Sequence, residues 1–91
     1  MSTTTSAQRL RQRAVVLRGF AGHIERLAVL TVHIEAGVET WVGPSPQACA
    51  DDLRTRAAQL RAEATDLRSE ARRLDRMADE MDAQATLTGP R

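Results

Sequence analysis

The side chains of this 91-residue chain that could take part in chemistry are one cysteine, two histidines and scattered carboxylates. His23 and His33 are ten residues apart on one predicted helix. That separation is about 15 Å along the helix axis, too far for a shared metal ion. Cys49 falls in the first turn of a second predicted helix, where a thiol can be reactive, but a small buried apolar role is favoured. The carboxylates are spread over a solvated face, so the sequence predicts no catalytic residue, no metal, no cofactor and no enzyme.

Charge and hydropathy argue against nucleic-acid and membrane partners. All thirteen basic residues are arginine and the net charge is only +1, so no strong field attracts a polyanion. The cluster of Arg9, Arg11 and Arg13 has no aromatic neighbours for base stacking and is predicted to be a solvated helix start. Charged residues such as Arg18 and Glu25 interrupt the apolar stretches of the first half. The sequence therefore predicts no stable membrane insertion and no cleavable Sec-type signal peptide.

The second half of the chain repeats a strict heptad, with Ala at one seam position and Leu or Met at the other, which predicts a helix over residues 46–86. Ala, Leu, Arg, Asp and Glu dominate the composition and strand-forming residues are few, so the expected fold class is all-α. The members of this seam are Ala50, Leu53, Ala57, Leu60, Ala64, Leu67, Ala71, Leu74, Ala78, Met81 and Ala85.

The first half also has a helical period and predicts a helix over residues 7–41, with Ser6 as its N-cap. The predicted seam consists of Leu10, Ala14, Leu17, Phe20, Ile24, Leu27, Thr31, Ile34, Val38 and Trp41. Further apolar residues widen the arc to about 200°. They are Val15, Val16, Ala21, Ala28, Val29, Leu30 and Val32.

One neighbouring helix cannot cover so wide an apolar arc. We therefore expect two hairpins to pack through their first helices into a four-helix bundle, as a homodimer or a heterodimer. The residues predicted to bind the partner are Val16, Phe20, Leu27, Leu30, Ile34 and Trp41.

The stretch TWVGPSPQ predicts a turn over residues 42–45 between the two helices. Gly43 suits the left-handed position that follows a helix C-terminus, and Pro44 stops the first helix there. Ser45 can cap the second helix. Trp41 is predicted to close the end of the hairpin, to face a partner, or to do both.

A turn this short makes the two helices antiparallel neighbours over residues 7–86, with flexible ends at 1–6 and 87–91. Facing residues should then have numbers with a nearly constant sum, and the two seams align at a sum of 87 or 88. The predicted facing pairs are Val38 with Ala50, Ile34 with Leu53, Thr31 with Ala57, Leu27 with Leu60, Ile24 with Ala64, Phe20 with Leu67, Leu17 with Ala71, Ala14 with Leu74 and Leu10 with Ala78.

A chain of this length, with a helix, a Trp41-Val42-Gly43 turn followed by Pro44, and a second long helix, resembles the ESX-like or WXG family of type VII secretion hairpins. The resemblance implies a non-enzymatic four-helix-bundle dimer, exported without a Sec signal by a membrane ATPase machine. It also implies a Tyr-x-x-x-Asp/Glu signal after the second helix, whereas this chain has no tyrosine. One interpretation is a signal-less member of a heterodimer, carried out by a partner that has the signal.

Two function classes follow. The first is a type VII secretion-associated hairpin, an exported substrate or co-secreted partner, cytoplasmic before export and then secreted or at the cell surface. The second is a cytosolic helical interaction module, such as a small chaperone or adaptor for the helical domain of a larger protein. The expected partners are a second copy, a second small hairpin, the secretion machinery or a larger helical-domain protein, and no nucleic acid.

Overall fold

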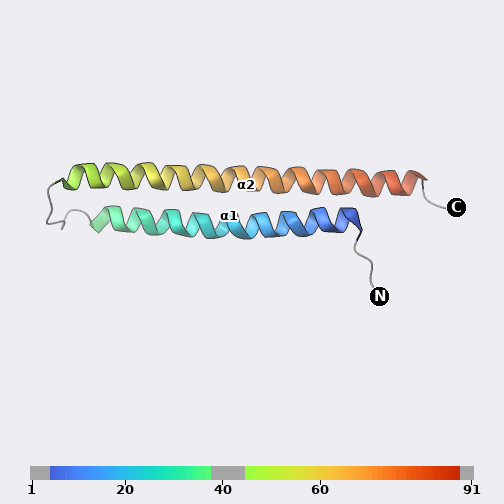
Figure 1. Ribbon diagram of the computed structural model, residues 1–91, viewed down its shortest axis with the longest axis horizontal. Coiled ribbons are helices and arrows are strands. Elements are labelled where there is room, and N and C mark those ends of the chain that lie inside the picture. Colours follow the sequence, from blue (N-terminus) through green and yellow to red (C-terminus); the bar gives the residue numbers. More distant parts are fainter. Residues whose placement is uncertain (1–4, 38–44, 89–91) are drawn as a thin grey trace.

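Two long antiparallel helices make up the fold (Figure 1). The structure is a computed structural model that describes residues 5–37 and 45–88. Helix α1 spans Ser6–Ala36 and helix α2 spans Pro46–Thr88, and the described residues contain no strand. The molecule is a rod with principal extents of 74 × 24 × 13 Å. The predicted all-α hairpin is therefore confirmed, whereas Trp41 and residues 42–44 of the predicted turn, among them Gly43 and Pro44, lie outside the described part of the chain.

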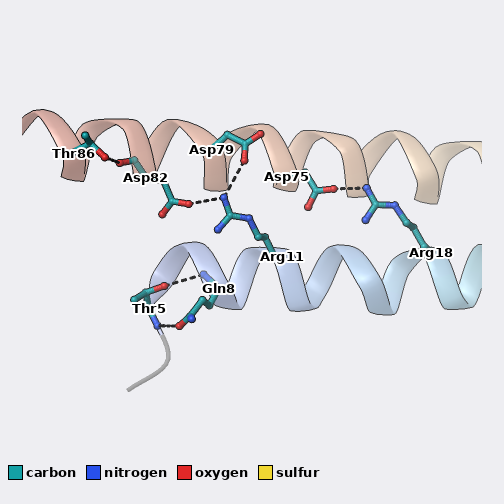
Figure 2. Close-up of polar contacts among 8 residues, drawn as sticks. All are labelled: Thr5, Gln8, Arg11, Arg18, Asp75, Asp79, Asp82 and Thr86. Carbon is teal, nitrogen blue, oxygen red and sulfur yellow. Dashed lines mark hydrogen bonds and ion pairs between the residues drawn. The ribbon is translucent and has the colours of Figure 1, made fainter. Parts of the chain in front are cut away.

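Helix α1 begins one residue before the predicted start, because Thr5 is its N-cap instead of Ser6. The backbone N–H of Gln8 donates to Thr5 Oγ1 at 3.1 Å, and the backbone N–H of Thr5 donates to Gln8 Oε1 at 2.8 Å (Figure 2). This reciprocal capping box satisfies two donors that a helix start leaves without partners. A Ser6 cap would have no such return bond from the residue three positions on, which is Arg9.

Helix α1 ends at Ala36 with Gly37 as its C-cap, short of the predicted end at residue 41. The N–H of Gly37 donates to the carbonyls of Ile34 and Glu35, which tightens the last turn. Glycine is a poor helix former because its backbone loses the most entropy on folding, which explains an end at this point. Residues 38–44, including the rest of the predicted extension, lie outside the described residues.

Helix α2 begins at Pro46, as predicted, and the N–H of Cys49 donates to the carbonyl of Ser45 at 3.1 Å. It continues to Thr88, past the predicted end at residue 86. Near this end the hydroxyl of Thr86 donates to the carbonyl of Asp82 at 2.9 Å, so this polar side chain finds its partner within its own helix (Figure 2).

Alanines form most of the buried seam between the two helices. They recur every seven residues on both helices, so small side chains let the two backbones approach closely. Ala14, Ala71 and Leu74 form a buried cluster against which Leu10 and Leu17 pack, as the predicted register requires. The buried residues are Ala7, Ala14, Ala21, Ala28, Ala57, Ala64, Ala71, Leu74 and Ala78.

The predicted seam of the first helix is wrong at three positions. Phe20, Leu27 and Ile34 are 56, 40 and 53% exposed, and Ala21 and Ala28, one residue later than the first two, are buried instead. The reason is steric. The sequence register places leucines of α2 opposite these points, and a second large side chain there would hold the helices apart. Ala21 and Ala28 let the helices close, and the corresponding residue after Ile34 is Glu35, which pairs with Arg54 of α2.

Candidate interaction surface on the first helix

Five of the six residues predicted to bind a partner lie exposed on one face of α1. Val16, Phe20, Leu27, Leu30 and Ile34 have exposures between 40 and 56%. Trp41, the sixth, lies outside the described residues. The structure therefore leaves a row of large apolar side chains uncovered beside a seam built mostly from alanine, which is unusual for a small chain in water.

This row has its own heptad spacing. His23, which is also exposed, fills the gap between Phe20 and Leu27, so the steps alternate between four and three residues. Such steps keep side chains on one face of a helix and are typical of a seam that packs against another helix. We call this row the outer stripe, and its members are Val16, Phe20, His23, Leu27, Leu30 and Ile34.

Near the turn the outer stripe opens into a hollow shared by both helices. Leu27, Leu30 and Ile34 from α1 line this hollow together with Leu60 from α2, and its volume is about 360 Å³. Polar side chains of α2, among them Glu63, form its rim. A side chain from another helix can enter here and contact both helices of the hairpin at once.

At the other end of the stripe a second hollow of about 390 Å³ lies on α1. It is lined by Val16 and Leu17 and by two arginines, Arg9 and Arg13, with Gln12 between them in sequence. The outer stripe thus runs from an arginine-lined hollow at the start of α1 to an interhelical hollow near its end.

Ion pairs bridge the opposite edge of the hairpin at several points. Phe20 and Leu27 each precede a buried alanine, which places them on one flank of the seam. Arg11, Arg18 and Glu25 follow the inward positions Leu10, Leu17 and Ile24, which places them on the other flank. The two flanks of α1 are therefore chemically different.

The charged flank of α1 is matched to α2 by ion pairs over part of its length, and Val29 and Val32 stay 57 and 44% exposed on this side, beside a hollow of about 340 Å³. Arg11 Nη2 lies 2.9 Å from Asp79 Oδ1 and 2.6 Å from Asp82 Oδ2, and Arg18 pairs with Asp75 (Figure 2). These hydrogen bonds, the one to Asp79 first, raise the pKa of Arg11 above its ordinary value. Ion pairs therefore bridge the two helices over the part of this edge near the start of α1.

The same flank continues toward the turn with the charges exchanged between the helices. Arg68 Nη1 lies 2.5 Å from Glu25 Oε2, and this hydrogen bond holds the pKa of Glu25 below its ordinary value. Arg54 Nε lies 3.4 Å from Glu35 Oε1. Both carboxylates of α1 are therefore paired with α2.

The residues considered for chemistry are not brought together. His23 and His33 are both exposed, and Cys49 is half-buried, more open than the buried role favoured for it. Over residues 5–37 and 45–88, no three His, Cys, Asp or Glu side chains are grouped so that they could hold a metal ion. Neither helix, as far as it is described, is long and apolar enough to cross a membrane.

Sequence reasoning found the apolar members of the outer stripe but not two of its features. It considered His23 as a metal ligand, rejected that role and assigned no other, although its spacing from Phe20 and Leu27 places it in the stripe. It also treated Arg9 and Arg13 as part of a solvated cluster with Arg11, although heptad spacing puts them on a different flank from Arg11.

No protein-family model, curated protein or solved structure matches this chain.

Proposed function

We propose that this protein is a non-enzymatic, type VII secretion-associated helical hairpin that works by packing its outer stripe against a helix of a partner. The partner completes a four-helix bundle, and the chain is exported as a substrate or as a co-secreted dimer partner. The observation that carries this proposal is the outer stripe itself, a continuous row of exposed side chains along α1, whereas ion pairs bridge part of the opposite flank.

The composition of the seam supports an association of this kind. Nearly all buried residues are alanines, and the described part of the chain contains no large side chain that is fully buried. Each buried methylene contributes about 0.8 kcal/mol, so an alanine seam gives a small hairpin little stability. Packing Phe20, Leu27 and Ile34 against a partner would supply the large apolar side chains that the seam lacks.

The secretion part of the proposal rests on the layout of the chain. It combines a hairpin of two long helices with the sequence Trp41-Val42-Gly43-Pro44 between them. The protein would be cytoplasmic before export and then secreted or at the cell surface. Because the chain has no tyrosine for the usual export signal, we propose that a partner carries that signal.

The missing tyrosine also favours a second candidate, a cytosolic helical interaction module. In that case the outer stripe covers a helical domain of a larger protein as a small chaperone or adaptor does. The binding face is the same in both proposals, and the fate of the complex differs.

An export assay distinguishes the two candidates. The tagged chain would be followed in culture medium and cytosol, with and without its co-expressed partner, in cells with an intact or deleted secretion ATPase. The secretion proposal expects the chain in the medium only with the partner and the ATPase. Retention in the cytosol under all of these conditions would contradict secretion and favour the cytosolic module.

A further inference from the structure

Two arginines at the start of the outer stripe, Arg9 and Arg13, carry charges that no described residue neutralises by an ion pair. Arg11, between them in sequence, is bound to Asp79 and Asp82 of α2, whereas Arg9 and Arg13 make no ion pair with any described residue. Arg13 lies within electrostatic reach of Glu70, whose pKa is lowered mainly by its hydrogen bond with Arg73. Both arginines instead line the hollow that contains Val16.

The rest of α1 offers no carboxylate to oppose them. Glu25 and Glu35 are its only acids, and these are paired with Arg68 and Arg54 of α2 on the other flank. The first turn of α1 contains no acidic residue either, so the positive end of the helix dipole adds to the basic character of this end. On α1, the N-terminal end of the outer stripe is therefore apolar with a basic border, and the carboxylate of α2 within reach of Arg13, Glu70, is hydrogen-bonded to Arg73.

A second copy of the chain is poorly suited to this surface. A parallel α1 would place Arg9 and Arg13 against the same arginines, and an antiparallel α1 would bring its other end, where Glu35 is already paired, to face them. The α2 helix of a second copy has no matching stripe, because its exposed large apolar residues all lie near its C-terminal end. They are Met77, Met81 and Leu87.

We propose that the outer stripe takes a helix of a different protein, whose apolar seam is bordered by carboxylates at the end that lies over Arg9 and Arg13. This inference rests on the proposed function and specifies the partner, so the complex is a heterodimer. Opposite charges at such a border raise the rate of encounter and fix the orientation of the two helices, while the apolar seam provides most of the affinity.

Two synthetic helical peptides test the charge of the partner. Both peptides have the same stripe of leucines at heptad spacing. The residues that flank this stripe at one end are glutamates in the first peptide and lysines in the second, and the rest of the two sequences is identical. We expect the full-length chain to bind the glutamate peptide at least tenfold more tightly, with a preference that shrinks at high salt. The double variant Arg9→Glu/Arg13→Glu should reverse the preference, and the matched control Arg72→Glu/Arg76→Glu on α2 should keep it.

The outcomes separate this inference from the function on which it rests. If both peptides bind equally and Phe20→Glu abolishes that binding, the claim of an acidic partner is overturned, and the outer stripe is still the docking face. Binding that Phe20→Glu leaves unchanged, or no binding of either peptide, would overturn both. If the chain associates with itself more tightly than it binds either peptide, the proposal is overturned, and the occupant of the outer stripe is a second copy of the chain. If the chain binds vesicles of anionic phospholipid more tightly than either peptide, the proposal is overturned, and the outer stripe binds a membrane surface.

Discussion

Arg68 of α2 places its guanidinium Nη1 2.5 Å from the Glu25 carboxylate of α1, across the flank of the hairpin that faces away from the outer stripe. Two further pairs, Arg11–Asp82 and Arg18–Asp75, lie on the same flank. In those pairs the arginine belongs to α1, whereas in the Glu25–Arg68 pair it belongs to α2. A slip of one heptad in either direction would bring two like charges together, Glu25 with Asp75 or Arg18 with Arg68. The charged flank therefore specifies the register as well as adding to stability.

Charge reversal tests this role in register. Glu25→Arg should lower the midpoint of urea unfolding because it opposes Arg68, and Glu25→Arg/Arg68→Glu should recover most of the loss. Circular dichroism of the helices is the measurement. If the double variant is as unstable as the single one, the pair does not act through its charges.

The same pair predicts a dependence of stability on pH. Arg68 lowers the pKa of Glu25 below its ordinary value of 4.5, and Arg73 lowers that of Glu70 in the same way. As the pH falls, the unfolded chain takes up protons before the folded one, so the stabilisation is present above the ordinary pKa and is lost below it. We expect the midpoint of urea unfolding to decrease as the pH is lowered from about 5 to about 3.

A matched pair of variants assigns that pH dependence. Glu25→Gln should flatten the profile and lower the midpoint at neutral pH. Glu80→Gln, at an exposed position on α2 where no ion pair is formed with a described residue, should leave the profile unchanged. Two identical profiles would show that the decline at low pH has another source.

The alanine seam predicts that a larger side chain is harmful only where the helices touch. Ala71 is fully buried against α1, so Ala71→Leu forces the helices apart and should destabilise the hairpin by about 1–3 kcal/mol. Ala83→Leu, at an exposed position of α2, should change the free energy of unfolding by less than about 0.5 kcal/mol. Denaturant titrations of both variants provide the comparison, and equal effects would contradict the close contact at Ala71.

Gly19 offers a gain in stability. It lies in the interior of α1, and a Cβ added there would meet no atom within 4 Å, so no contact within the chain requires a glycine. Replacing an unrestricted helical glycine by alanine contributes about 1 kcal/mol, so Gly19→Ala should raise the midpoint of thermal unfolding. A lower midpoint would show that another backbone approaches α1 at this position.

The sequence was sufficient to predict the hairpin, the heptad of α2 and the start of that helix. It was not sufficient to choose between two stripes on α1 that lie one residue apart, one through Phe20 and Leu27 and one through Ala21 and Ala28. Hydropathy favours the larger side chains for the core. Packing reverses the choice, because the leucines of α2 leave room only for alanine opposite them.

The candidate site shows the same limit of sequence reasoning. The first helix has an apolar arc wider than one neighbouring helix can cover. That width was enough to predict an uncovered face on this helix and the five apolar residues of the outer stripe. The sequence alone did not show that Arg11 lies on a different flank of α1 from Arg9 and Arg13. The flank of each arginine depends on which residues of α1 form the buried seam. Once Ala14 is known to be buried, Arg13 falls on the flank of the outer stripe and Arg11 on the flank of the ion pairs.

The most direct test of the docking face compares glutamate substitutions on the two helices. The tagged chain would be isolated from its native cells with its bound partner, and the mass of the complex measured by sedimentation velocity for wild type, Phe20→Glu and Ala62→Glu. Phe20 and Ala62 are both exposed in the hairpin, so neither change should unfold it, which circular dichroism would check. We predict that wild type and Ala62→Glu sediment as the complex and that Phe20→Glu sediments as the free tagged chain. A Phe20→Glu complex as abundant as that of the wild type would contradict the proposal that the outer stripe is the docking face.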